Sequence, residues 1–115
     1  MKLYYTPGAC SLATRISLHE AGMRADFERV DLETKVTERG DDYFAINPNG
    51  SVPVLVLDDG QAVTENVAIL MLIADDEPVF QPGNPLGRTR LIEMLSYLST
   101  ELHAAFKPLW RPSDE

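Results

Sequence analysis

The sequence predicts an α/β domain with a mixed four-stranded sheet, followed by a linker and one long helix. Short β-prone runs alternate with helical segments over residues 1–77, which favours a sheet covered by helices. Residues 78–87 are interrupted by prolines and glycines, and an amphipathic stripe follows them. A chain of 115 residues has room for one complete domain and a partial one.

The amino-terminal part of the chain predicts a βαβ unit. Residues 2–6 are β-prone and end at Pro7-Gly8. Ser11 is expected to cap a helix that runs to Gly22, with that glycine at the C′ position. Residues 27–32 form the second predicted strand.

A charged segment and a short helix are expected next. Residues 34–41 predict a loop or a frayed helix. Either Asp41 or Asp42 can cap a short helix over residues 43–46, which Asn47-Pro48 would stop.

The following residues predict a hairpin and a third helix. Residues 54–57 and 61–64 are the strands, joined by an Asp-Asp-Gly turn at 58–60. A helix then begins at Thr64 or Glu65. Its expected shared face consists of Val67, Leu70, Ile73 and Ala74.

After the linker, one helix is predicted from Arg88 to about Lys107, ended by Pro108. Its apolar stripe consists of Leu91, Leu95, Leu98, Leu102 and Phe106. The element order β-α-β-α-β-β-α before the linker is the thioredoxin-like arrangement. Such an uncovered stripe packs on the first domain, on another subunit or on a missing second domain.

Composition excludes several classes of function. The net charge is −8 and no basic stripe occurs, so nucleic acid and anionic membrane surfaces are not expected as partners. The longest apolar run, residues 67–74, is too short to span a bilayer, and no secretory signal is expected. One cysteine and two distant histidines lack metal-ligand spacing. A single cysteine also favours a reducing, cytoplasmic location.

Three segments are expected to meet at the carboxyl edge of the sheet, where open α/β sheets bind ligands. Cys10 lies at the mouth of the first helix, where backbone N–H groups favour the thiolate. The alternative is that Cys10 is simply a small buried apolar residue. Tyr5 ends the first strand and could turn its hydroxyl toward this crevice or pack as an ordinary strand aromatic.

The other two segments offer backbone groups and charge. A cis peptide at Val52-Pro53 would expose the Val52 backbone to a peptide-like ligand, whereas a trans proline would merely start the strand. Glu65-Asn66 opens a helix that suits a zwitterionic ligand, or is simply a helix cap. His103 could donate to a thiolate or lie on a solvated face, and Lys35 reads as a surface residue.

These motifs resemble those of the bacterial beta-class glutathione S-transferases, and the resemblance runs from Met1 to about Pro112. Gly-Ala-Cys-Ser-Leu and Asp-Tyr-Phe-Ala-Ile-Asn-Pro are the most specific motifs. The matching segments are residues 2–5, 7–12, 41–48, 50–55, 58–60, 64–70 and 101–106.

The resemblance implies roles for four residues around a sulfur. Cys10 would contact the sulfur of glutathione and could form a mixed disulfide with it. Tyr5 and Ser11 would be auxiliary hydroxyls near that sulfur. His103 would reach it from the first helix of a second domain.

The resemblance also implies how the rest of glutathione is held. Lys35 would pair with the glycyl carboxylate, and Val52, next to cis Pro53, would pair with the cysteinyl backbone. Glu65 and the Asn66 backbone would hold the γ-glutamyl end.

The expected function is therefore that of a cytoplasmic, homodimeric detoxification transferase. Glutathione would be its co-substrate, its thiolate would attack a hydrophobic electrophile, and no metal is expected. The expected domains are a glutathione-binding domain at 1–77, a linker at 78–87 and, at 88–115, the first helix of a truncated all-helical domain. The alternatives are thiol-disulfide exchange through Cys10 and a non-catalytic glutathione-binding or dimerisation module.

Overall fold

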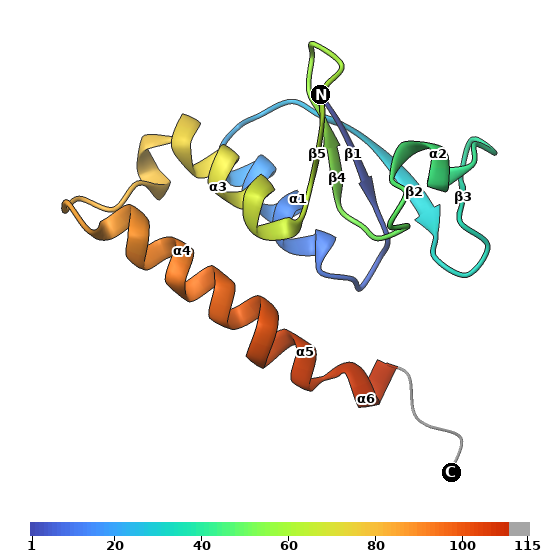
Figure 1. Ribbon diagram of the computed structural model, residues 1–115. Coiled ribbons are helices and arrows are strands. Elements are labelled where there is room, and N and C mark those ends of the chain that lie inside the picture. Colours follow the sequence, from blue (N-terminus) through green and yellow to red (C-terminus); the bar gives the residue numbers. More distant parts are fainter. Residues whose placement is uncertain (111–115) are drawn as a thin grey trace. The chain divides into compact units, whose positions relative to one another are not determined.

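The computed structural model describes residues 1–110, which divide into two compact units, Met1–Val79 and a second unit that begins at Phe80. The first unit contains a mixed sheet with the strand order β3-β2-β1-β4-β5 (Figure 1). Only β1 and β2 pair in parallel, and the other neighbours are antiparallel. The strands are β1 (Lys2–Tyr5), β2 (Asp26–Asp31), β3 (Val36–Thr37), β4 (Val54–Val56) and β5 (Ala62–Thr64).

The predicted α/β, thioredoxin-like fold is confirmed, but the sheet has five strands instead of four. The additional strand, β3, lies in the segment expected to be a loop or frayed helix. It is two residues long and pairs Thr37 with Val30 and Val36 with Asp31. A strand this short has no periodicity of its own, and only its partner strand defines it.

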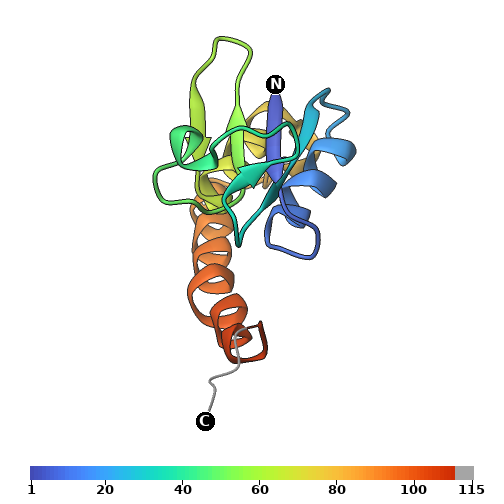
Figure 2. The same ribbon diagram turned by 90° about the vertical axis from the view of Figure 1, so that its right-hand side faces the viewer.

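Helices cover both faces of the sheet. The helices α1 (Ser11–Glu20) and α3 (Asn66–Asp76) lie on one face, and the short α2 (Tyr43–Ile46) lies on the other (Figures 1 and 2). Asp42 caps α2, as predicted, because its Oδ1 accepts a hydrogen bond from the Phe44 N–H at 3.0 Å. Gly22 ends α1 with φ 65°, as predicted for the C′ position.

The larger helices bury an aliphatic core against the sheet. Leu3 of β1 and Leu55 of β4 are direct cross-strand partners and are fully buried. In α3, Ile73 and Ala74 are buried as predicted, but Val67 and Leu70 are only half-buried, and Ile69 is fully buried instead. Because α3 packs against α1 as well as against β4 and β5, the buried side of the helix includes Ile69 and not Val67 or Leu70.

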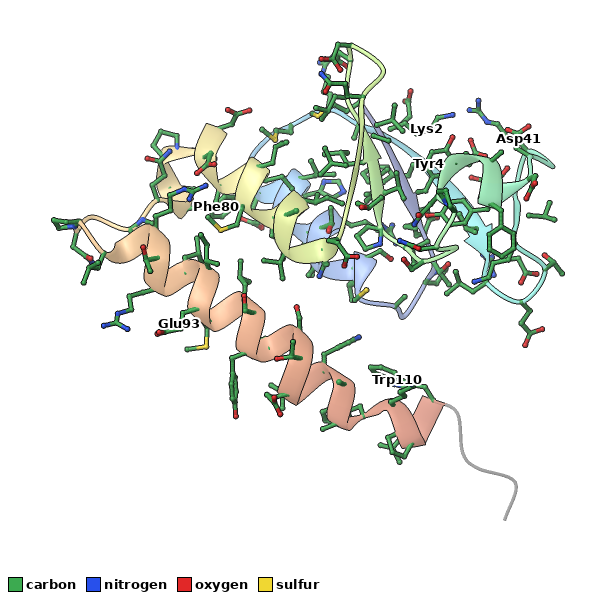
Figure 3. The ribbon with its side chains drawn as sticks, in the orientation of Figure 1. Lys2, Tyr4, Asp41, Phe80, Glu93 and Trp110 are labelled. Atoms are coloured by element: carbon green, nitrogen blue, oxygen red, sulfur yellow. The ribbon has the colours of Figure 1, made fainter. Side chains whose placement is uncertain are left out.

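The opposite face of the sheet carries a second apolar cluster. It consists of Tyr4, Val30, Tyr43, Val52 and Val54. The rings of Tyr4 and Tyr43 lie 5.8 Å apart. Figure 3 shows Tyr4 and Lys2 on the side of β1 away from α1 and α3. This cluster attaches α2 to the sheet and includes Val52, one of the predicted site residues.

A buried carboxylate lies beside this cluster. Glu28 is 1% exposed, and its Oε1 accepts a hydrogen bond from Lys2 Nζ at 3.0 Å. Burial raises the pKa of Glu28, but hydrogen bonds from Thr37 and Lys2 and the charge of Arg39 outweigh it, so that the pKa is lowered overall. The ion pair therefore joins β1 to β2 and neutralises the buried charge through Oε1, whereas Oε2 of Glu28 makes no hydrogen bond.

The second unit is helical. Its elements are α4 (Gly87–Tyr97), a π turn η2 (Leu98–Leu102), α5 (His103–Ala105) and α6 (Lys107–Trp110), after the 3₁₀ turn η1 (Pro78–Phe80) at the boundary. The predicted helix thus continues to Ala105, but Pro108 does not end it. Pro108 lies in the first turn of α6, where a proline needs no N–H partner. Residues 111–115, the end of the predicted helical domain, lie outside the described residues.

None of the helices in residues 1–110 combines the length and the apolar character that a bilayer crossing requires.

Candidate functional site

Three of the predicted segments do meet at the carboxyl end of β1. Cys10 Sγ donates a hydrogen bond to the carbonyl oxygen of Val52 at 3.4 Å, which joins the start of α1 to the turn before β4. The charge of Glu65, at the start of α3, acts on the Cys10 thiol. A sulfur and a strand-end backbone are therefore in contact here, and the Thr14–Asn66 hydrogen bond joins the start of α3 to the same helix as Cys10.

The electrostatics of Cys10 differ from the sequence-based expectation. Cys10 occupies the N-cap position of α1 and is half-buried. Burial raises the pKa of its thiol, the backbone N–H groups of Cys10 and Ser11 lower it, and the charge of Glu65 raises it. The helix start acts in the predicted direction, but burial outweighs it, so the pKa is raised above 9.0.

This balance predicts a slow reaction of Cys10 with iodoacetamide at neutral pH. The alkylation rate follows the thiolate fraction, so its midpoint is expected above the ordinary pKa of 9.0. The measurement is the alkylation rate of the protein between pH 6 and 11, with free cysteine as the control. A midpoint below that of free cysteine would show that the helix start dominates.

Ser11 does not cap α1, contrary to the prediction. It is the first residue of the helix and is fully buried. Its Oγ accepts a hydrogen bond from the Thr6 N–H and donates one to the Thr6 carbonyl, both at 3.2 Å. Because these bonds close the loop between β1 and α1, Ser11 fixes the loop that presents Cys10. Its role as an auxiliary hydroxyl near a sulfur stays a prediction.

Tyr5 belongs to a group of aromatic and cationic side chains. Its ring packs edge-on against Phe27 at 6.3 Å, and the Arg15 guanidinium carbon lies 4.3 Å from its centroid. Cation–π packing of this kind holds the ring in place. The role of the Tyr5 hydroxyl beside a sulfur stays a prediction.

The turn before β4 is held by two buried side chains. The Val52–Pro53 peptide bond is cis, as the resemblance implies. The preceding carbonyl, that of Ser51, accepts hydrogen bonds from Tyr43 Oη at 2.7 Å and Asn47 Nδ2 at 2.8 Å. These bonds fix the backbone on the amino-terminal side of Val52.

Lys35 lies against the same turn, although the residue pattern alone describes it as a surface residue. It has φ 58°, and its Nζ donates to the Gly50 carbonyl at 2.8 Å. Gly50 has φ 68°, and a Cβ there would lie 2.8 Å from Cε1 of Phe44. The positive φ and the nearby Phe44 ring both favour glycine at position 50. The hydrogen bond to Gly50 brings the Lys35 ammonium within two residues of Val52.

The start of α3 combines charge with unpaired helix donors. Glu65 has φ 71°, is exposed and makes no side-chain cap hydrogen bond. Thr14 Oγ1 donates a hydrogen bond to Oδ1 of Asn66 at 2.6 Å. Helix-start N–H groups favour a carboxylate, and an acidic side chain favours an ammonium group. This end of α3 suits an amino-acid group.

His103 belongs to the second unit and is not among the residues that the first unit brings together. Its ring lies 4.5 Å from that of Trp110. Its approach to a sulfur stays a prediction.

A cavity of about 480 Å³ opens at the amino-terminal ends of β1 and β2, away from Cys10. Its lining residues are Met1, His19, Met23, Arg24, Ala25, Asp26 and Phe27. None of the predicted site residues lines it. Within residues 1–110, no group of three or more side chains is arranged to hold a metal ion.

Comparison with known proteins decides the family. Residues 8–76 match the model of the glutathione S-transferase N-terminal domain. The chain belongs to the glutathione S-transferase family. The matched residues contain Cys10, the turn before β4 and the start of α3, so the family match coincides with the site.

The relatives support the beta class. Glutathione S-transferase GstA of Escherichia coli O157:H7 is 52% identical over 115 residues, which cover 97% of this chain and 57% of that protein. The beta-class enzyme of Sphingomonas chungbukensis has a TM-score of 0.92 and 49% identity. A sphingomonad glutathione S-transferase complexed with glutathione has a TM-score of 0.91 and 47% identity. Each structure covers 100% of this chain, which spans 59% of each structure.

Three polar residues of this glutathione S-transferase site were given no role there from the sequence, although two of them belong to the Asp-Tyr-Phe-Ala-Ile-Asn-Pro motif. Tyr43 and Asn47 hold the Ser51 carbonyl, and Thr14 holds Asn66. The signals in the sequence were weak. Thr14 is a polar residue on the buried side of an amphipathic helix, and Asn47 directly precedes a proline.

Proposed function

We propose that the first unit binds glutathione and stabilises its thiolate for conjugation to hydrophobic, electrophilic small molecules. The observation that carries the proposal is that hydrogen bonds join Cys10 to the Val52 carbonyl and α1 to the start of α3 within one compact unit. The glutathione complex of a sphingomonad relative supports the same ligand.

The chemistry of the site matches the three parts of the tripeptide. The Val52 backbone would pair with the cysteinyl residue beside cis Pro53, and Lys35 would leave the Gly50 carbonyl to pair with the glycyl carboxylate. Glu65 would hold the γ-glutamyl ammonium group, and the Asn66 backbone its carboxylate. Each pKa unit removed from the bound thiol corresponds to about 1.4 kcal/mol of preference for the thiolate.

Thiol-disulfide exchange is the second candidate function, because Cys10 is a free, half-buried thiol at this site. Its thiolate would attack one sulfur of glutathione disulfide, form a mixed disulfide and release the other half as glutathione thiolate. The raised pKa of Cys10 disfavours this reaction at neutral pH. Conjugation is therefore the preferred function.

The remaining expectations extend the same proposal. A role in detoxification, a cytoplasmic location and assembly as a homodimer follow from the resemblance. Tyr5 and His103 would complete the sulfur site. The chain spans 57% of its relative GstA, so a non-catalytic glutathione-binding or dimerisation module is the alternative to turnover.

Calorimetric titration of the 115-residue protein with glutathione tests the ligand directly. Saturable binding of glutathione, and weaker binding of N-acetyl-cysteinylglycine, is the expected result. Absence of glutathione binding by the folded protein would reject the proposal. Conjugation and thiol-transfer assays on Cys10→Ala then separate the two reactions: conjugation is expected to persist and thiol transfer to disappear.

A further inference from the structure

A buried hydroxyl connects the middle of α1 to the beginning of α3. Thr14 is 0% exposed, and its Oγ1 donates to Oδ1 of Asn66 at 2.6 Å. Asn66 is half-buried and is the first residue of α3. A threonine inside a helix often bonds to its own backbone, whereas this one is aligned by a partner 52 residues away.

The direction of this hydrogen bond sets the orientation of the Asn66 amide. The carbonyl oxygen of the amide accepts from Thr14, so the Nδ2 group is the end directed away from Thr14 and able to donate. It belongs to the same first turn of α3 whose backbone N–H groups have no side-chain cap. Side-chain and backbone donors are therefore gathered at one end of one helix.

The conformation of Glu65, the residue before Asn66, makes the Thr14–Asn66 hydrogen bond more important. Glu65 adopts φ 71°, a region that non-glycine residues rarely occupy and that persists where the surroundings impose it. The hydrogen bond from Thr14 holds the next residue, Asn66, and so limits the positions that the Glu65 carboxylate can take.

We propose that Thr14 is a positioning residue for the γ-glutamyl end of glutathione. It holds the Asn66 amide with its donor directed toward the γ-glutamyl carboxylate and keeps Glu65 placed for the ammonium group. This inference rests on the proposed glutathione site and assigns a function to a buried residue that does not itself touch the ligand.

The test compares Thr14→Val, which removes the hydroxyl at nearly constant volume, with Thr14→Ser, which keeps it. Thr14→Val is expected to raise the Kd of glutathione roughly fivefold, whereas Thr14→Ser stays within about twofold of the wild type. The Kd of N-acetyl-cysteinylglycine, which lacks the γ-glutamyl group, is expected to be the same for all three proteins. If Thr14→Val weakened the binding of both ligands by the same factor, Thr14 would have only a general packing role, and the inference would be overturned.

A second variant keeps the inference testable if Thr14→Val does not fold. Asn66→Ala must also weaken glutathione selectively, and wild-type affinity in that variant would overturn the inference. Where both fold, the Thr14→Val/Asn66→Ala double variant is expected to bind like Asn66→Ala alone, and additive losses would contradict it. Failure of the wild type to bind glutathione would instead reject the proposed function, a result distinct from selective loss in the variants.

Discussion

Glu65→Gln is expected to weaken glutathione binding about tenfold while leaving the fold intact. The substitution keeps the size of the side chain but removes the charge proposed to hold the γ-glutamyl ammonium group. A charge-assisted hydrogen bond is roughly twice as strong as a neutral one. Glu65 is exposed, so solvent screening limits the loss to about one order of magnitude. Calorimetric titration with glutathione measures it.

The same variant has a consequence that needs no ligand. The charge of Glu65 raises the pKa of the Cys10 thiol, so Glu65→Gln is expected to move the midpoint of Cys10 alkylation to lower pH. Asp76→Asn is the matched control, because it removes one negative charge at the exposed far end of the same helix. If Glu65→Gln and Asp76→Asn weaken glutathione binding by the same factor, net charge and not the position of Glu65 governs binding.

Sequence reasoning succeeds in this protein where a structure is determined locally. Asp42 caps α2 by accepting a hydrogen bond from the backbone N–H two residues later. At the end of α1, the N–H of Gly22 donates to the His19 carbonyl and the N–H of Met23 to the Leu18 carbonyl, both at 3.0 Å. Both depend on residues within five positions. The strand β3 was missed because it depends on pairing with β2, a contact that follows from the fold. Ser11 was expected to be a cap, but its hydroxyl bonds to Thr6, five residues earlier, and that contact depends on the conformation of the loop between β1 and α1.

The candidate site was likewise predictable only in part. The topology of an α/β sheet is enough to bring Cys10, Val52 and Glu65 to one edge. The sign of the pKa shift of Cys10 could not be predicted, because it depends on burial by neighbouring segments rather than on the helix start alone. Thr14 carried little signal because its partner lies on another helix.

Tyr43→Ala is expected to destabilise the first unit by about 3–5 kcal/mol. The Tyr43 ring is fully buried, packs against Tyr4 and is the largest fully buried side chain within residues 1–110. Small domains are stable by only about 5–15 kcal/mol, so this loss would be a large fraction of the total stability. Urea unfolding measures the loss. Phe44→Ala removes a neighbouring aromatic side chain that is 48% exposed and is expected to cost about 1 kcal/mol or less.

Tyr43→Phe separates the hydroxyl from the ring. The lost bond to the Ser51 carbonyl costs about 1 kcal/mol near pH 8, since Asn47 still donates to that oxygen. Burial raises the pKa of Tyr43 from 10.0 to about 12. A raised pKa stabilises the folded state below pH 10, and this stabilisation, about 3 kcal/mol, is lost between pH 10 and 12. Phenylalanine has no such loss.

The stability curves of the wild type and Tyr43→Phe are therefore expected to cross. The wild type is the more stable protein at pH 8, and the phenylalanine variant becomes the more stable one above about pH 11 as the wild type loses its Tyr43 proton on unfolding. Urea unfolding of both proteins at several pH values gives the difference directly, and other alkaline titrations cancel in it. A difference that stays constant from pH 8 to 12 would mean that Tyr43 ionises as easily in the folded protein as in the unfolded chain. The hydroxyl would then not be sealed between Ser51 and the apolar cluster.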